Sequence, residues 1–366
     1  MKFASIVGAR PNFMKLAPLA RAFAPRPDVE HFIVHTGQHY DAAMSDDFFR
    51  DLEIPEPRYH LAVGSSSHAA QTAAVMERIE PVFQNERPDV VIVYGDVNST
   101  VAAALTAAKL NIRIAHVEAG LRSRDRTMPE EINRMVTDAI ADLLLAPSPD
   151  AVENLRAEGH TDEQIHFVGN IMIDTLVHAL AKTRNGNGSA NDAAPKEPYL
   201  VATLHRPANV DDPRTIAELM SALVELGTEM PVVFPVHPRT RERLQALAAQ
   251  APRATEGRLQ LVEPLSYPAM ARLVAGSQAV ITDSGGLQEE TTFLGVPCLT
   301  VRTTTERPIT CTEGTNRLVA ANRRAIVAAT HEALATRRPA PPTSDRWDGH
   351  TAERIVSLLC NGTMGM

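Results

Sequence analysis

The stretch VVIVYGDVNSTVAAALTAAKLNIRIAHV, residues 90–117, alternates two kinds of pattern. Residues 90–94 are consecutive apolar, largely β-branched residues, which is typical of a strand buried on both faces. The alanine-rich segment 99–110 has the composition of a helix, and residues 112–117 return to a strand pattern. A buried strand, a helix and a second strand in close succession predict a parallel sheet with crossover helices.

The same alternation extends over both halves of the chain. In the first half we expect further strands at residues 3–7 and 31–35, and helices at 13–23, 71–83 and 130–141. In the second half the expected strands are 199–204, 232–236, 259–262, 279–283 and 297–301, and the expected helices are 217–226, 241–249 and 287–294. Two arrays of this kind predict an α/β protein of two Rossmann-like domains.

The boundary between the two domains is placed near Gly169, which gives domains of residues 1–169 and 170–349. A helix predicted at residues 172–181 then opens the second domain. The polar, glycine-containing run 184–198 cannot bury apolar area and is predicted as a flexible loop. The amphipathic segment 351–359, within the C-terminal stretch 350–366, is a candidate to pack back on the first domain.

Composition argues against several classes of protein. The 366-residue chain has a net charge of −8, so it offers no broad basic surface for nucleic acid. Its three cysteines form no Cys-x-x-Cys pair and predict buried thiols in a reducing compartment. No apolar run approaches the roughly 20 residues that span a bilayer, and residues 1–9 are predicted as a first strand rather than a signal peptide. We therefore expect a cytoplasmic protein without a nucleic-acid or membrane partner.

Two segments have the features of anion-binding turns. Arg10 and Lys15 follow the first strand and flank a predicted helix start, where anions are favoured. Their positions are equally explained if both are solvated cations on the surface. Ser284, Gly285 and Gly286 lie between a strand and a helix, where glycines let backbone N–H groups approach a diphosphate. The same residues would also fit a tight strand-to-helix turn capped by Ser284.

Two further residues lie close to the second of these turns in the predicted fold. Glu290, one turn into the helix, is placed to accept hydrogen bonds from ribose hydroxyls. Arg307, in the segment TTERP at residues 304–308, follows the next strand and offers a cation to the same sheet edge. The chain has no G-x-G-x-x-G at its first strand, so a nicotinamide or flavin cofactor is not indicated.

Carboxylates follow several strands of the first half. Asp96 and Glu118 each follow a predicted strand, and Glu130 and Glu131 begin a predicted helix. Helix capping explains Asp96, and complementing the helix dipole explains Glu130 and Glu131. Glu118 lies between a buried strand and a glycine and has no such structural explanation. Carboxylates clustered near a bound diphosphate are the groups that general acid–base chemistry requires.

Histidines follow two strands of the second half. His205 and Arg206 follow the strand 199–204, and His237 follows the strand 232–236. A histidine beside an arginine at a strand end suits phosphate contact or proton transfer, although each is also explained as a structural or surface histidine.

A metal site is not expected from the histidine pattern. His31, His35 and His39 are spaced by four, as metal ligands on a helix would be. The sequence between His31 and His35 is β-like, so the spacing would not place these side chains on one helix face.

Taken together, these segments resemble the non-hydrolysing UDP-N-acetylglucosamine 2-epimerase family. The resemblance runs in order over nearly the whole chain, and ten motifs in register make it highly specific. The motifs are GARPNFMK (8–15), HTGQHY (35–40), YGDVNST (94–100), HVEAGLR (116–122), PEEINR (129–134), VGN (168–170), TLHR (203–206), VHPR (236–239), TDSGGLQEE (282–290) and TTERP (304–308).

The resemblance implies a GT-B-type pair of Rossmann-like domains with an active site in the cleft between them, a homodimer and no redox cofactor. It implies interconversion of UDP-GlcNAc and UDP-ManNAc by elimination of UDP to 2-acetamidoglucal and re-addition. The implied acid–base candidates are Asp96, Glu118, Glu130 and His205. The residues implied to hold UDP are Arg10, Lys15, His205, Ser284, Gly285, Gly286, Glu290 and Arg307. The implied positions for an activating second UDP-GlcNAc are Gln38, His39, Arg206 and His237.

The sequence departs from the family pattern at residues 97–99, at the short segment 123–128 and at Met270, where some members have an aromatic residue. Its first-half motifs also resemble epimerases of UDP-2,3-diacetamido-2,3-dideoxyglucuronate. Three competing hypotheses are a hydrolysing epimerase that releases ManNAc and UDP, a GT-B glycosyltransferase and a UDP-sugar-binding regulator without activity. The complete TTERP segment argues against hydrolysis, and the carboxylates argue against simple transfer and against an inactive protein.

Overall fold

The computed structural model describes residues 1–38, 49–184, 194–236, 240–241, 243–244, 258–335 and 346–361. The chain divides into unit 1, Met1–Val177 with Asp345–Met366, and unit 2, His178–Ser344. This division falls inside a helix, α7, whereas the sequence pattern placed the boundary before that helix, near Gly169. Among the helices of the described ranges, none has the length and apolar content of a membrane-spanning segment.

Unit 1 contains a fully parallel sheet in the order β3-β2-β1-β4-β5-β6-β7. The central strand β4 is the run VVIVY at the start of the stretch 90–117, and all five of its side chains are buried. The strands are β1 (Lys2–Val7), β2 (Glu30–His35), β3 (Tyr59–His60), β4 (Val90–Tyr94), β5 (Arg113–Val117), β6 (Leu143–Ala146) and β7 (Ile165–Phe167).

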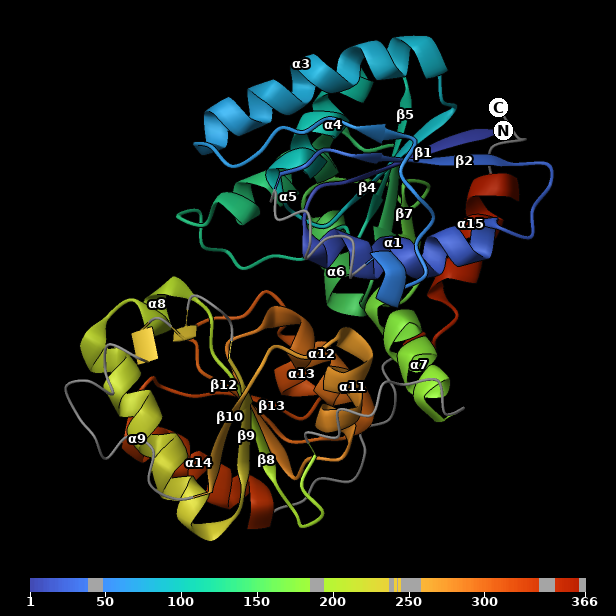
Figure 1. The fold of residues 1–366 in the computed structure, drawn as a ribbon. Coiled ribbons are helices and arrows are strands. Elements are labelled where there is room, and N and C mark those ends of the chain that lie inside the picture. The colour runs from blue at the N-terminus through green and yellow to red at the C-terminus, as the bar shows by residue number, and fades with distance from the viewer. Residues whose placement is uncertain are drawn as a thin grey trace. The chain divides into compact units, whose positions relative to one another are not determined.

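Helices cover both faces of this sheet (Figure 1). Helices α3 and α4 pack on one face over a core of Ile79, Phe83 and the alanines of α4, while α1 packs with α15 on the other. The helices of unit 1 are α1 (Arg10–Phe23), α3 (His68–Glu86), α4 (Asn98–Lys109), α5 (Pro129–Ile140), α6 (Pro149–Ala157), the first part of α7 (Ile171–Arg184) and α15 (Thr351–Asn361).

The C-terminal helix α15 belongs to unit 1 although it follows unit 2 in the sequence. Its first turn is held by Asp174 of α7, whose carboxylate accepts hydrogen bonds from the amides of Thr351 and Ala352 at 3.2 and 2.8 Å. The indole of Trp347, just before the helix, donates to the carbonyl of Pro147. The segment that the sequence indicated as a candidate to pack on the first domain thus lies against α1.

Unit 2 repeats the architecture with a smaller parallel sheet in the order β10-β9-β8-β11-β12-β13. As in unit 1, the central strands are fully or almost fully buried. The strands are β8 (Leu200–Thr203), β9 (Val232–Pro235), β10 (Leu259–Val262), β11 (Ala279–Thr282), β12 (Cys298–Thr300) and β13 (Asn316–Leu318).

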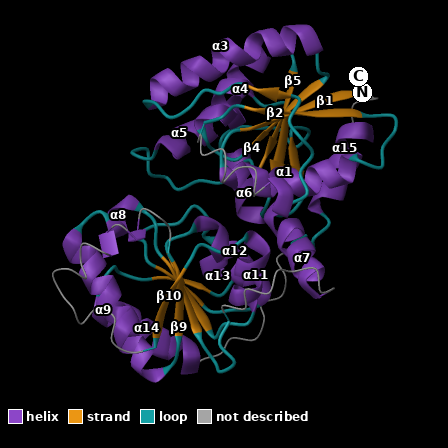
Figure 2. Cartoon of the chain, viewed as in Figure 1, coloured by secondary structure: helices purple, strands orange, loops and turns teal. Residues whose placement is uncertain are grey.

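The helices of unit 2 form two layers with separate cores. Helices α9 and α14 pack on one face of the sheet, and α11 and α12 pack on the other (Figure 2). The helices are the end of α7, α8 (Pro207–Val210), α9 (Pro213–Glu229), α11 (Tyr267–Ala275), α12 (Gly285–Leu294), α13 (Ile309–Thr312) and α14 (Arg323–Ala335). The helix predicted at 241–249 and the loop predicted at 184–198 lie mostly outside the described residues.

Each sheet has one point at which the strand order reverses. In unit 1 it lies between β1 and β4, and in unit 2 it lies between β8 and β11. The helices that follow the two strands at such a point leave on opposite faces, so the carboxyl edge opens there, and ligands of α/β proteins bind at this place. The α/β class with two Rossmann-like sheets is confirmed, and the two reversals indicate where to look for chemistry.

Candidate active site

The turn after β1 is tied to the end of β4, its neighbour across the reversal in unit 1. The side-chain amide of Asn12 donates to the carbonyl of Tyr94 at 2.9 Å. Its oxygen accepts from the amides of Gly8 and Ala9, so the start of α1 is fixed relative to β4. Arg10 lies half-buried at the first position of α1, in the place that the sequence predicts for an anion contact.

Lys15 and Glu118 form a buried ion pair, each with a side chain only 6% exposed. Lys15 comes from α1, and Glu118 directly follows β5. Glu118 has a φ of 73°, which lies in the left-handed region of backbone conformation. Residues other than Gly, Asn and Asp seldom occupy this region, and holding one there costs about 1–3 kcal/mol. The ammonium of Lys15, which the family resemblance implies as a UDP contact, lies against the carboxylate of an acid–base candidate.

Asp96, just after β4, lies within reach of solvent with a side chain 28% exposed. One of its carboxylate oxygens accepts two hydrogen bonds from the guanidinium of Arg134, at 2.6 and 3.0 Å. Arg134, on α5, also donates to Glu131 at 2.6 Å. Asp96 is therefore a partly accessible carboxylate oriented by a buried cation, which suits a group that exchanges protons with a substrate.

The two glutamates at the start of α5 have different environments. Glu131 is buried and accepts hydrogen bonds from the amides of Ser123 and Arg124 at 2.9 and 2.8 Å. Burial alone would raise the pKa of Glu131, but these hydrogen bonds and the charge of Arg134 lower it below its usual value. Glu131 therefore fixes the loop before α5, whereas Glu130 is half-buried and is the one that the family resemblance implies as an acid–base candidate.

Across the reversal in unit 2, the fully buried Asp283 after β11 organises the end of β8. Its carboxylate accepts from the amides of His205 and Arg206 and from the side chain of Asn209. It also lies 2.9 Å from Nδ1 of His205. Burial alone would raise the pKa of Asp283, but the hydrogen bond and charge of His205 hold it below its usual value. The carboxylate thus fixes both the backbone and the ring of His205, whose side chain is 46% exposed.

The Ser-Gly-Gly turn forms the start of α12. Ser284 is the residue before the helix, with an extended backbone and no capping hydrogen bond from its side chain. Its amide donates to Thr282 at 3.0 Å. A Cβ at Gly285 would lie 2.8 Å from a carboxylate oxygen of Glu306 and 3.0 Å from a nitrogen of Arg307. Glycine therefore leaves room here for the close approach of Glu306 and Arg307, and the interpretation of Ser284 as a side-chain cap does not hold.

Arg307 lies between two buried carboxylates. Its guanidinium is 2.6 Å from Glu306 and 2.9 Å from Glu289. Glu306 also pairs with Arg302 at 2.9 Å. Burial alone would raise the pKa of Glu306, but the charges of Arg307 and Arg302 lower it far below its usual value. Arg307, the cation expected to contact the diphosphate, is thus held beside Gly285. It is one of four side chains in a cluster of two cations and two carboxylates.

Glu290, on the same helix, is almost fully buried and accepts a hydrogen bond from the hydroxyl of Tyr267 at 3.0 Å. Burial raises the pKa of Glu290 to about 7. The hydrogen bond from Tyr267 lowers this pKa, and the negative charge of Glu289 raises it further. The carboxyl is therefore placed as an acceptor but is costly to ionise.

The four positions implied for an activating ligand are only partly described. Gln38 is buried, and its side-chain oxygen accepts from the amide and hydroxyl of Ser99 at 3.0 and 2.7 Å, which is a structural role. Arg206 is half-buried at the end of β8. His39 and His237 lie outside the described residues. His31 and His35 lie on strand β2, as the sequence predicts.

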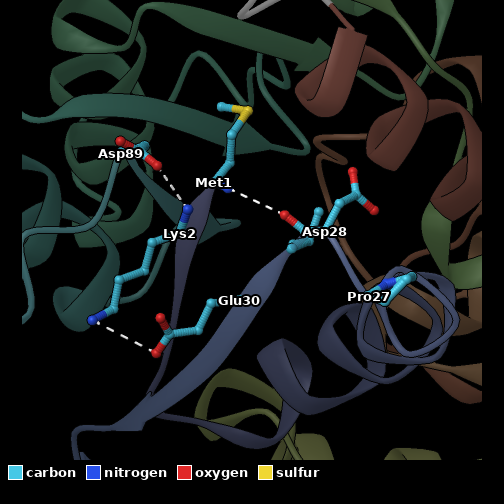
Figure 3. Close-up of a pocket in the computed structure, with 7 residues that line it drawn as sticks. Met1, Lys2, Pro27, Asp28, Glu30 and Asp89 are labelled. Atoms are coloured by element: carbon cyan, nitrogen blue, oxygen red, sulfur yellow. Dashed lines mark hydrogen bonds and ion pairs between the residues drawn. The ribbon is translucent and has the colours of Figure 1, made fainter.

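A hollow of about 360 Å³ lies among residues of unit 1 that include Met1, Lys2, Asp28, Glu30 and Asp89 (Figure 3). In it the backbone amide of Lys2 donates to Asp89, and the Lys2 ammonium lies 3.6 Å from Glu30. These residues begin strands β1 and β2 or precede β4. The hollow is therefore at the amino edge of the sheet, opposite to the edge that carries Asp96 and Glu118.

Comparison with known proteins agrees with this geometry. The family model for UDP-N-acetylglucosamine 2-epimerase matches residues 21–360. A UDP-N-acetylglucosamine 2-epimerase homolog of Methanococcus maripaludis is 42% identical over 99% of this chain and 100% of its own length. The chain belongs to the UDP-N-acetylglucosamine 2-epimerase family. It is therefore an epimerase, an enzyme of the isomerase class.

Two further relatives of this epimerase bear on its fold and substrate. The structure of Methanocaldococcus jannaschii UDP-GlcNAc 2-epimerase in complex with UDP-GlcNAc and UDP matches with a TM-score of 0.86 at 37% identity, over 98% of this chain and 99% of that one. A UDP-2,3-diacetamido-2,3-dideoxy-D-glucuronate 2-epimerase of Pseudomonas aeruginosa is 41% identical over 91% of this chain and 92% of its own length. The relatives of this chain thus include epimerases named for each of the two sugar nucleotides that the sequence left open.

Sequence reasoning missed several residues that build the candidate site. Asn12, Arg134 and Asp283 orient the candidates but were not singled out. Asp283 carried the same signal as Asp96, since both lie within two residues of the end of a buried strand. Arg134 offered no such signal, because its partner Asp96 lies 38 residues away in the sequence.

Proposed function

We propose that this epimerase interconverts UDP-GlcNAc and UDP-ManNAc by inverting C2 of the sugar. The observation that carries the proposal is the pair of carboxylates Asp96 and Glu118 at the carboxyl ends of adjacent strands, each oriented by a cation, Arg134 or Lys15. Such a pair can supply the base and the acid that a C2 inversion requires.

The proposed reaction runs through elimination and re-addition. A carboxylate takes the C2 proton, the C–H electrons form the C1–C2 double bond, and the C1–O bond breaks so that UDP leaves with its electrons. The intermediate is 2-acetamidoglucal. An acid then delivers a proton to the opposite face of C2 while a phosphate oxygen of UDP re-forms the bond to C1. Asp96, Glu118, Glu130 and His205 are the proposed acid–base groups.

We propose that unit 2 supplies most of the nucleotide binding. The backbone amides at Ser284, Gly285 and Gly286 start helix α12, where the helix dipole favours a diphosphate. Glu290 is proposed to accept from the ribose hydroxyls, and Arg307 and His205 to contact phosphate. Arg10 and Lys15 of unit 1 remain proposed UDP contacts, although Lys15 would have to serve both Glu118 and the nucleotide.

The test is to incubate the protein with UDP-GlcNAc in deuterated water and to follow the sugar by NMR. Appearance of UDP-ManNAc with deuterium at C2 supports the proposal. Free ManNAc with UDP would instead assign the protein to the hydrolysing epimerases. If UDP-GlcNAc is unchanged, the nucleotide of 2,3-diacetamido-2,3-dideoxyglucuronate is the second candidate, because the Pseudomonas aeruginosa relative acts on it.

Three properties remain predictions. These are assembly as a homodimer, location in the cytoplasm and activation by a second UDP-GlcNAc at positions that include Gln38 and Arg206. Strictly hyperbolic kinetics without activation by UDP-GlcNAc would argue against the third.

A further inference from the structure

His116, on strand β5, is completely buried and lies two residues before Glu118. Its Nε2 is 2.8 Å from the carbonyl oxygen of Gly95, and its Nδ1 is 2.6 Å from a carboxylate oxygen of Asp138 on α5. Both ring nitrogens therefore face oxygen atoms that belong to other elements of unit 1.

The partners of His116 determine where its protons lie. A carbonyl oxygen only accepts hydrogen bonds, so Nε2 must carry a proton. The other oxygen of Asp138 accepts from the amide of Gly120 at 3.1 Å and lies 2.7 Å from the guanidinium of Arg122. The amide donor and the adjacent cation favour a carboxylate at Asp138, and Nδ1 must then carry a proton as well.

The charges around this ring balance one another. Asp138 faces His116 from α5, and Arg122 approaches from the loop after β5 and pairs in turn with Glu158. Burial alone would raise the pKa of Asp138, but the charge and hydrogen bond of His116, with Arg122, lower it below its usual value. A charged ring is thus compatible with complete burial, because its counter-ion is at hydrogen-bond distance.

The Gly95 carbonyl that His116 holds belongs to the turn on which the candidate site is built. Gly95 has a φ of 59° and immediately precedes Asp96. A Cβ at Gly95 would lie 2.7 Å from the Lys15 ammonium and 3.0 Å from a carboxylate oxygen of Glu118. The hydrogen bond from Nε2 therefore fixes the backbone at the point where Asp96, Lys15 and Glu118 come together.

We infer that His116 is a positioning residue, held as an imidazolium, that fixes the Gly95–Asp96 turn and exchanges no proton during turnover. The inference rests on the proposed epimerase function and deepens it. A histidine two residues from Glu118 would otherwise be a natural choice of general base. With both nitrogens directed at buried oxygens, the proton exchanges fall to the carboxylates and to His205.

Two variants of His116 separate positioning from proton transfer. His116→Gln keeps an amide N–H near the place of Nε2 and can still donate to the Gly95 carbonyl. His116→Asn is one methylene shorter and cannot reach it. Neither carries a ring charge to pair with Asp138, and neither can act as an acid or base near neutral pH, so each is the control for the other.

We expect His116→Asn to lower kcat by about 10- to 100-fold, because a displacement of about 1 Å at the reacting groups can have that effect. KM and the affinity for UDP should change by less than about threefold. His116→Gln should retain at least about a fifth of wild-type kcat with the limbs of the pH–rate profile in place. If both variants were equally inactive while folded and able to bind UDP, the hydrogen bond to the Gly95 carbonyl would not be what His116 contributes and the inference would be wrong.

A spectroscopic measurement on the unmodified protein needs neither activity nor a stable variant. In protein labelled with 15N-histidine, both ring nitrogens of His116 should show the shifts of protonated nitrogens under the conditions of the epimerase assay, with and without UDP. A neutral ring under those conditions would overturn the inference. Failure of the epimerase assay with an imidazolium still present would count against the proposed function alone.

Discussion

Glu290 is a single residue whose burial makes both stability and binding depend on pH. Burial raises its pKa from 4.5 to about 7. Below about pH 4.5 the carboxyl is protonated in the folded and unfolded chains alike. Between pH 4.5 and 7 the unfolded chain has lost this proton and the folded chain has kept it, so the folded state loses stability as pH rises, by about 3 kcal/mol in all.

Glu290→Gln removes this ionisation and should therefore unfold at higher urea concentration than the wild type at pH 8. At pH 4.5 the two proteins should unfold at similar concentrations, because both side chains are then neutral. Urea titrations at the two pH values test this. An equal difference between the two proteins at both pH values would show that Glu290 ionises normally.

The pair of Lys15 and Glu118 gives a second prediction at this scale. Lys15→Met removes the cation beside a buried carboxylate, which typically costs about 3–5 kcal/mol. Adding Glu118→Gln removes the uncompensated charge and should recover part of the thermal stability without restoring turnover. Thermal unfolding of both variants tests the pair, and equal midpoints for the two would show that the carboxylate does not depend on Lys15.

The sequence predicted the positions of most candidate side chains, because each follows a strand whose carboxyl edge is where ligands bind. It did not predict how they are paired. That Lys15 contacts Glu118 and that Arg307 lies between Glu289 and Glu306 depends on side-chain directions in three dimensions. Local periodicity carries no information about such long-range contacts.

Among the elements, the turn at Gly169 between β7 and α7 gives a prediction with a built-in control. Gly169 has a φ of 95°, and a Cβ there would collide with the backbone carbonyl of Arg346. Gly159 has the same φ of 95°, but a Cβ there would meet no atom within 4 Å. Gly159→Ala should cost about 1–2 kcal/mol from backbone strain, and Gly169→Ala should cost more. Thermal unfolding measures both, and equal losses would mean that the Arg346 carbonyl moves away freely.

The long elements were predicted better than the short ones. Strand β4 matches its predicted range, and α4 is shifted by one residue. The edge strand β3 and the short helices α8 and α13 were not predicted, because two to four residues carry no periodic signal. Strands β6 and β7 were missed for the same reason, since four apolar residues or fewer fit a strand and a buried helix turn equally well. Helices α6, α11 and α14 were also missed, although the alanine-rich composition of α14 is typical of a helix.

At the scale of the whole molecule, the proposal assigns proton chemistry mainly to unit 1 and nucleotide binding mainly to unit 2. The fold does not by itself decide either assignment, because both units have a parallel sheet with one reversal of strand order. What distinguishes the units is the residues that follow these strands. Glu118 and Asp96, paired with Lys15 and Arg134, follow β5 and β4, whereas Asp283 and a glycine turn follow β11.

The division of labour predicts opposite effects for two conservative variants. Asp96→Asn keeps the size and one acceptor oxygen of the side chain but removes its proton affinity, so kcat should fall by about 100-fold or more. Its affinity for UDP should stay within about threefold of the wild type.

Glu290→Gln should weaken UDP binding by about tenfold or more at pH 8, since a charged acceptor for the ribose hydroxyls becomes a neutral one. Calorimetric titration with UDP, together with the NMR assay of turnover, separates the two effects. Near-normal turnover of Asp96→Asn would remove Asp96 from the acid–base groups, and loss of UDP binding in that variant would mean that Asp96 itself helps to hold the nucleotide.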